Sequence, residues 1–216
     1  MATSSLDIKK LILVPAIISL VITLVRLFGE LSDGLPFLFN KESGGAGALI
    51  GITWLVPIFG IYFAVKLVKS GHGPKSVWKV IGFALLAIVV SVLIAVAAGR
   101  LGPGLVGQRI RGLLVLIAAL AIAYKPWGEL SKTLLAYALA ARIPVAVLMF
   151  FAILGNWGTH YDVPPLGFPE MGFFAKWVVI GLLPQLTTWI AFTLVIGSLA
   201  GGIASALVKA KSPLPD

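Results

Sequence analysis

Residues 77–99 have the sequence VWKVIGFALLAIVVSVLIAVAAG, in which Lys79 is the only charged side chain. A helix needs about 20 apolar residues to cross a hydrocarbon core about 30 Å thick, and this run supplies them without interruption. Because lipid offers a backbone no hydrogen-bond partners, such a segment satisfies its own polar groups as a helix. The run therefore predicts a transmembrane α-helix.

The composition extends this prediction to the whole chain. Of the 216 residues, 59% are hydrophobic and 12% are charged, and the mean hydropathy is +1.06. Soluble domains carry about 25% charged residues. We therefore expect residues 1–216 to form one integral membrane domain, an all-α polytopic transmembrane bundle of about six spans joined by short loops.

Six apolar runs are candidate spans. The first resembles a signal peptide, but it reaches Phe28 without a small-x-small cleavage site, so we interpret it as an uncleaved span. The run from Phe173 to Val208 is too long for one upright crossing and too short for two, and we expect it to start along the interface, bend at Pro184 and then cross. The predicted spans are residues 11–28, 48–68, 77–99, 112–127, 134–155 and 180–208.

The positions of Lys and Arg predict the orientation, because cytoplasmic loops carry the excess of these residues. With the N-terminus inside, the inner side collects Lys9, Lys10, Lys66, Lys69, Lys75, Lys79, Lys125, Lys132, Lys209 and Lys211. The outer side collects Arg26, Lys41, Arg100, Arg109, Arg111 and Lys176, together with Glu30, Asp33, Glu42, Asp162 and Glu170. Although the three arginines at 100–111 oppose the rule, we expect an N-in/C-in protein of the plasma membrane, the inner membrane in a bacterium.

Several function classes are disfavoured. The net charge of +9 is scattered at the ends of apolar runs rather than clustered, so we expect no nucleic-acid partner. The chain has no Cys, and it carries no P-loop, Rossmann, HExxH or GxSxG motif. Neither His lies in a predicted span, which disfavours bis-His haem ligation. We expect no cofactor and no metal, and we favour a non-catalytic protein over an enzyme.

Arg142 is the most informative residue, because it lies inside the fifth run and the predicted spans contain no Asp or Glu to pair with it. An unpaired guanidinium in hydrocarbon costs at least about 2.5 kcal/mol. Carbonyls freed near Pro144, the polar group Gln185, Thr187 and Thr188, water or an anionic ligand such as a lipid phosphate could solvate it. Alternatively, residues 134–141 lie along the cytoplasmic interface and Arg142 snorkels. We hypothesise that Arg142, Gln185 and Thr188 bind an anion.

The predicted outer loop, residues 156–171, contains His160, Asp162 and Glu170. Imidazole and carboxylate groups could form a metal or acid–base site. The loop is also rich in turn residues and carries Trp157 and Tyr161, which is typical of an interfacial cap with aromatic rings at headgroup depth. We favour the cap and keep the acid–base group as an alternative.

Small residues and prolines suggest how the helices pack. Small residues four apart let helix backbones approach closely in lipid, and we expect these stripes to serve the bundle itself more than a partner protein. Pro57 and Pro184 each fall inside a predicted span and predict kinks. Pro15 with Gly29 and Pro144 with Gly155 hint at a parallel duplication. The stripes are Gly47 with Gly51, Gly197 with Gly201 and Ser205, and Ser91 with Ala95 and Gly99.

Three functions are compatible with these features. The first is a non-catalytic membrane protein, permease-like or an accessory subunit, that holds an anionic lipid or solute near Arg142. The second is a membrane-embedded lipid-modifying enzyme that uses His160 and Asp162. The third is an assembly factor whose glycine stripes contact other membrane proteins. The expected partners are therefore the bilayer, an anionic lipid and, in the third case, membrane proteins.

Overall fold

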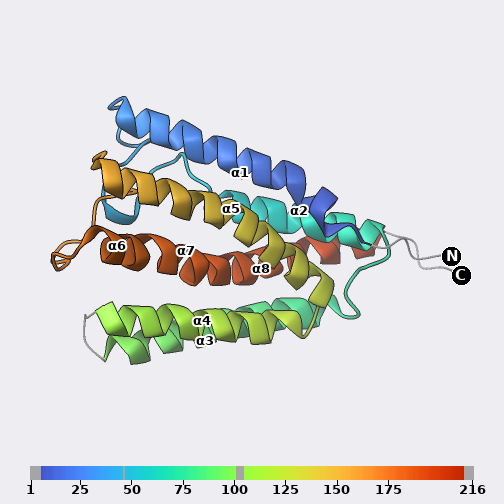
Figure 1. Cartoon of the computed structure of the whole chain (residues 1–216). Helices are drawn as coiled ribbons and strands as arrows, with labels where there is room; N and C mark the ends of the chain where they lie inside the picture. The colour runs from blue at the N-terminus through green and yellow to red at the C-terminus, as the bar shows by residue number, and fades with distance from the viewer. Residues whose placement is uncertain (1–5, 46, 101–104, 212–216) are drawn as a thin grey trace, which may run out of the picture.

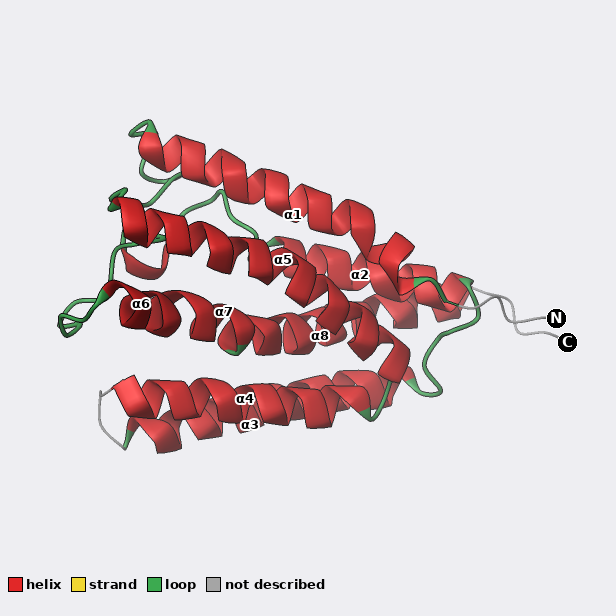
Figure 2. Cartoon of the chain, in the orientation of Figure 1, coloured by secondary structure: helices red, strands yellow, loops and turns green. Residues whose placement is uncertain are grey.

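The computed structural model describes residues 6–45, 47–100 and 105–211, with the side chains of 105–109 and 209–211 excluded. Within these residues the chain is all-helical and contains no strand (Figures 1 and 2). The long helices are α1 (Ile8–Leu31), α2 (Leu55–Lys69), α3 (Val77–Gly99), α4 (Leu105–Tyr124), α5 (Gly128–Gly155) and α8 (Thr188–Lys211). The short ones are η1 (Ser43–Gly45), α6 (Phe173–Lys176), the π-helical turn η2 (Trp177–Leu182) and α7 (Leu183–Leu186).

Four helical segments are long and apolar enough to cross a membrane: α1, α3, α5 and the segment Phe173–Val208. Their outward faces are apolar, as Phe28 and Leu93 illustrate with 73% and 62% of their surface exposed. Exposed apolar surface on this scale suits acyl chains and not water. The prediction of an all-α membrane bundle is confirmed at this level. The start of α1 and the end of α8 lie at the same end of the bundle (Figure 1).

The first predicted span ended too early. Helix α1 continues to Leu31, so it contains Glu30, and the expectation that no span contains Asp or Glu is wrong. The helix continues because Arg26 lies one turn before Glu30, and its Nε donates to Glu30 Oε1 over 2.8 Å. The pair offsets the charge of Glu30 and so lowers the cost of burying this carboxylate.

The second predicted span started too early. Residues 48–54 are not helical, and α2 begins at Leu55, which gives 15 residues and a rise of about 22 Å. Gly44, Gly45 and Gly47 adopt positive φ, which interrupts the helical path despite the apolar sequence around them. The proposed Gly47–Gly51 helix stripe is therefore wrong. Pro57 lies in the first turn of α2, where proline is tolerated, and does not kink a span.

The fourth and fifth helices are longer than expected. Helix α4 begins at Leu105, before the predicted start at residue 112, so Arg111 lies within the helix. Helix α5 is continuous from Gly128 to Gly155, so residues 134–141 belong to the same helix as Arg142. Arg142 therefore lies near the middle of a 28-residue helix.

The helix around Pro184 is irregular, as the sequence predicts. Proline has no N–H for the carbonyl one turn earlier, and the backbone responds with the π-helical turn η2, in which Leu183 N–H donates to Val178 O. The helix then breaks at Thr187, where φ is −118° and ψ is −77°. Segment 173–187 is thus a bent start to the long C-terminal helix.

Small residues set the closest helix contact. A Cβ added to Gly60 of α2 would lie 2.5 Å from the carbonyl oxygen of Gly197 in α8, and one added to Gly201 would lie 2.9 Å from that of Gly60. The Gly197–Gly201 stripe therefore packs inside the bundle, against α2. Helices α3 and α4 lie side by side at one edge (Figure 1). The central core is apolar and includes Phe63, Tyr137 and Leu194.

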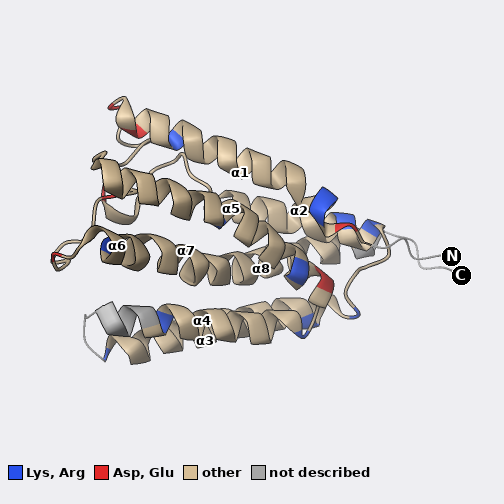
Figure 3. Ribbon diagram, in the orientation of Figure 1, with Lys and Arg blue, Asp and Glu red and all other residues tan. Residues whose placement is uncertain are grey.

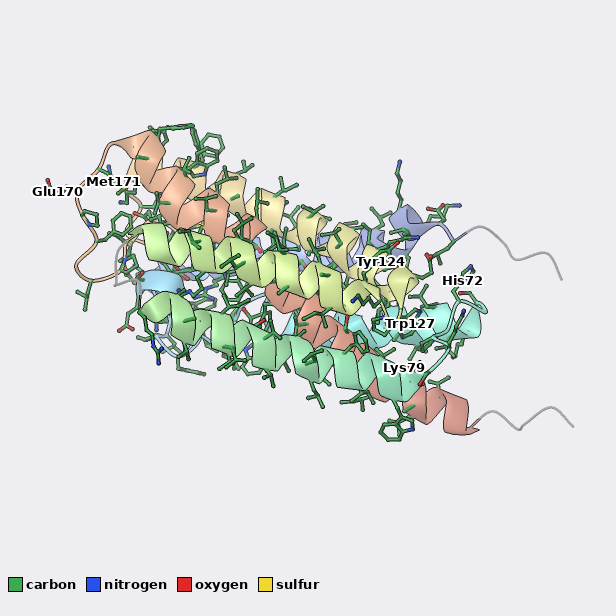
Figure 4. All side chains as sticks on the ribbon, turned by 90° about the horizontal axis from the view of Figure 1, so that it is seen from below. His72, Lys79, Tyr124, Trp127, Glu170 and Met171 are labelled. Carbon is green, nitrogen blue, oxygen red and sulfur yellow. The ribbon has the colours of Figure 1, made fainter. Side chains whose placement is uncertain are left out.

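Charges lie mainly at the two ends of the bundle (Figure 3). His72, Lys79 and Trp127 lie at the end that holds the termini, and Glu170 and Met171 lie at the opposite end (Figure 4). Trp127 Nε1 donates to His72 O over 2.8 Å, which joins the α4–α5 connection to the α2–α3 connection. We name the end with Glu170 the loop end. The side chains of Arg109, Lys209 and Lys211, used in the orientation argument, lie outside the described residues.

Candidate functional site

A cavity of about 730 Å³ lies in the loop-end half of the bundle. Its walls come from α1, α5, the bent segment 179–185 and Trp189 at the start of α8. Residues within 43–45 and 47–54, before α2, and within 160–168, after α5, form further walls. We name it the Arg142 cavity. Non-helical backbone is tolerated at membrane depth where it is buried in protein or lines a cavity. The non-helical residues that shorten α2 are therefore the same residues that line one side of the cavity.

Arg142 lies in the cavity wall with 4% of its surface exposed. Its Nη1 donates to Gln185 Oε1 at 3.5 Å, a long hydrogen bond, and its guanidinium lies 4.6 Å from the ring centroid of Trp189. Among the described residues it forms no salt bridge. A guanidinium has five N–H donors, so most of its hydrogen-bonding capacity remains for a ligand or water in the cavity.

The second guanidinium of the cavity, that of Arg26, is held by protein groups. Its Nε donates to Glu30 Oε1 over 2.8 Å, and its Nη2 donates to the carbonyls of Asn40 and Gly45 at 3.2 and 3.0 Å. Glu30 has 0% of its surface exposed and also accepts from the backbone N–H of His160 at 2.9 Å. This clasp, Arg26–Glu30–His160, joins α1 to the connection before α2 and to the loop after α5.

The imidazole of His160 completes the clasp, with Nδ1 2.5 Å from Glu30 Oε1. Burial lowers the pKa of His160 from its ordinary value of 6.5, the hydrogen bond to Glu30 opposes this, and nearby Arg26 adds to the lowering. The neutral form is therefore favoured at pH 7, with Nδ1–H donating to Glu30. Burial also raises the pKa of the neighbouring Tyr161 phenol, whose hydroxyl donates to Thr23 O at 3.3 Å.

The charges around the cavity do not cancel. Its lining, as far as the structure describes it, contains Arg26 and Arg142 but neither Asp nor Glu. Glu30 lies behind the wall and offsets Arg26. One positive charge, that of Arg142, is left without a counter-ion in a buried place. Such a charge is stabilised best by an anion or by organised polar groups.

The structure separates the residues that the sequence grouped together. Gln185 contacts Arg142, but Thr188 is exposed, lies against Gly112 of α4, and does not line the cavity. Asp162 accepts hydrogen bonds from the N–H groups of Gly158 and Thr159 and from Thr159 Oγ1, so it stabilises its own loop. Glu170 is exposed at the tip of the loop end (Figure 4). His160 therefore faces Glu30 rather than a group formed with Asp162 and Glu170.

Sequence reasoning missed Arg26, Glu30, Tyr161 and Trp189 as parts of the site. The spacing of Arg26 and Glu30 was the available signal, because residues four apart share a helix face. No such signal pairs Glu30 with His160, which lies 130 residues later.

No protein-family model, curated protein or solved structure matches the chain. The geometry and charge of the Arg142 cavity are therefore the features that indicate a function.

Proposed function

We propose that this chain is a non-catalytic multi-pass membrane protein, permease-like or an accessory subunit, whose Arg142 cavity binds an anionic ligand. The observation that carries the proposal is the buried guanidinium of Arg142, which faces a cavity without a carboxylate among its described lining residues. Guanidinium groups bind phosphates and carboxylates through parallel N–H donors. In a bacterium we place the protein in the inner membrane, with both termini in the cytoplasm.

The acid–base alternative has less support. The carboxylate oxygens of Asp162 accept three hydrogen bonds within the loop, and Glu30 occupies His160 Nδ1. An acid–base pair needs groups within reach of one substrate atom. The assembly-factor alternative also loses support, because Gly197 and Gly201 pack against α5 and α2 of the same chain.

Anion binding is testable with the purified full chain in mild detergent. Native mass spectrometry would measure retention of phosphatidylglycerol, a phospholipid with one negative charge, by the wild type and by Arg142→Gln. We expect Arg142→Gln to weaken retention by about 10-fold to 100-fold, the range for losing a charge-assisted hydrogen-bonded contact of about 1.5–3 kcal/mol.

Arg111→Gln is the matched control, because Arg111 is an exposed arginine on α4 that does not line the cavity. It should retain the lipid as the wild type does. Equal retention by Arg142→Gln and Arg111→Gln would contradict the proposal.

A further inference from the structure

The net charge of the cavity limits the charge of its ligand. Arg26 is already paired with Glu30, which leaves Arg142 as the single positive charge without a partner among the described lining residues. A ligand with one negative charge balances it. A second negative charge would be buried without a counter-ion, which is costly at low dielectric.

The rim of the cavity is apolar and exposed. Phe37, Leu49 and Trp54 line it, and each has 57–63% of its surface exposed. Exposed apolar surface of this kind suits acyl chains better than water. A ligand whose charged end lies at Arg142 can therefore extend an apolar chain across this rim.

Buried and half-buried apolar residues also line the cavity. Among them are Ile52, Val145 and Ile180. The cavity of about 730 Å³ corresponds to about 24 waters at about 30 Å³ each, so a free phosphate ion would leave most of it unfilled. Filling such a space with methylene groups is favourable, whereas filling it with water against apolar walls is not.

We propose that the ligand of the Arg142 cavity is an amphiphile with one net negative charge, whose head group contacts Arg142 and whose acyl chain crosses the rim formed by Phe37, Leu49 and Trp54. This inference rests on the proposed anion site and adds the class of the ligand. A phosphodiester lipid without a cationic head group, such as phosphatidylglycerol, has these properties.

The test compares three probes on the full chain in detergent by native mass spectrometry. Phosphatidylglycerol carries the single charge and two chains, phosphatidylcholine carries the same chains and no net charge, and glycerophosphoglycerol carries the charged head group without chains. We expect phosphatidylglycerol to bind at least about 10-fold more tightly than glycerophosphoglycerol, since burial of two methylenes alone supplies that factor. We also expect it to bind more tightly than phosphatidylcholine, which has the same chains but no net charge to balance Arg142.

A pair of exposed tryptophans tests the rim. Trp54 precedes α2 and lines the cavity, and Trp78 in the first turn of α3 is more exposed and does not line it. We expect Trp54→Ala to weaken phosphatidylglycerol binding by at least about threefold, less than the full effect of burying an aromatic ring, and to leave glycerophosphoglycerol binding unchanged. Trp78→Ala should change neither.

The outcomes separate the two proposals. If glycerophosphoglycerol binds as tightly as phosphatidylglycerol, or if Trp54→Ala matches Trp78→Ala, the amphiphile inference is overturned while the anion site stands. If phosphatidylcholine binds as tightly as phosphatidylglycerol and Arg142→Gln changes nothing, the anion site itself is overturned.

Discussion

Replacing Glu30 by Gln tests the clasp that closes the loop end of the bundle. The wild-type carboxylate is fully buried and accepts hydrogen bonds from Arg26 Nε and from two nitrogens of His160. The substitution keeps the shape but leaves the Arg26 charge, whose side chain is 10% exposed, without a counter-ion. Breaking a buried ion pair in this way costs about 3–5 kcal/mol. We therefore expect the free energy of unfolding to fall by that amount.

The measurement is equilibrium unfolding in mixed micelles with an increasing fraction of sodium dodecyl sulfate, followed by tryptophan fluorescence. Asp33→Asn is the control, because Asp33 forms an ion pair with Lys41 at 2.6 Å but its side chain is 87% exposed. It should unfold as the wild type does. The double variant Arg26→Met/Glu30→Gln should be more stable than the sum of the single effects predicts, since it also removes the unpaired charge.

If Glu30→Gln lowered the free energy of unfolding by less than about 1 kcal/mol, the range of an exposed ion pair, the clasp would not act as a buried pair. Strict additivity in the double variant would contradict the clasp as well, because it would mean that Arg26 and Glu30 do not interact.

Two further predictions concern packing and pH. Gly60→Ala places a Cβ 2.5 Å from Gly197 O and should destabilise the α2–α8 contact by about 1–3 kcal/mol. Gly82→Ala is the control, because its Cβ meets no atom within 4 Å, and it should be neutral or stabilising by up to about 1 kcal/mol. The same micelle titration measures both variants, and equal effects would contradict the close contact. For His160, a lowered pKa means that the unfolded chain binds the proton more readily, so the stability that this residue contributes is present above pH 6.5 and is lost as the pH falls through the lower folded-state pKa. His160→Gln should therefore lose less stability than the wild type between pH 7 and pH 5, and an unchanged pH dependence would show that His160 does not titrate as described.

The long apolar helices follow from hydropathy because nothing in them competes with the helix. Residues 77–99 are an example: the predicted range coincides with α3, and the Ser76 side chain accepts from Lys79 N–H to cap it. Pro184 was likewise predicted to bend its helix, because the loss of one N–H is a local property of the sequence.

The ends of α1 and α2 could not be predicted in this way. Hydropathy treats Glu30 as the end of a span, whereas tertiary contacts with His160 make its burial favourable. Residues 48–54 are apolar enough for a helix, but the positive φ values of the preceding glycines depend on how Arg26 holds the carbonyl of Gly45. The error in α2 involves a contact between residues distant in sequence, and the error in α1 involves such a contact together with the Arg26–Glu30 pair one turn apart.

Of the candidate site, only Arg142 and its partner Gln185 could be predicted from the sequence. Burial of Arg142 without an acidic partner follows from its place in an apolar run, and Gln185 lies close to it. Thr188 was grouped with Gln185 because both follow the bend predicted at Pro184, but Thr188 lies past the break at Thr187 and against Gly112. Arg26 was counted only as an outer-side charge, and its role in the cavity appears once its partners are known.

The most direct test of the anion site is an experimental structure of the full chain in nanodiscs that contain phosphatidylglycerol. We predict density for a phosphate within about 3 Å of the Arg142 guanidinium, the distance of a charge-assisted hydrogen bond, with a chain extending past Trp54. A cavity that holds only water, or an Arg142 side chain turned out of the cavity, would contradict the account.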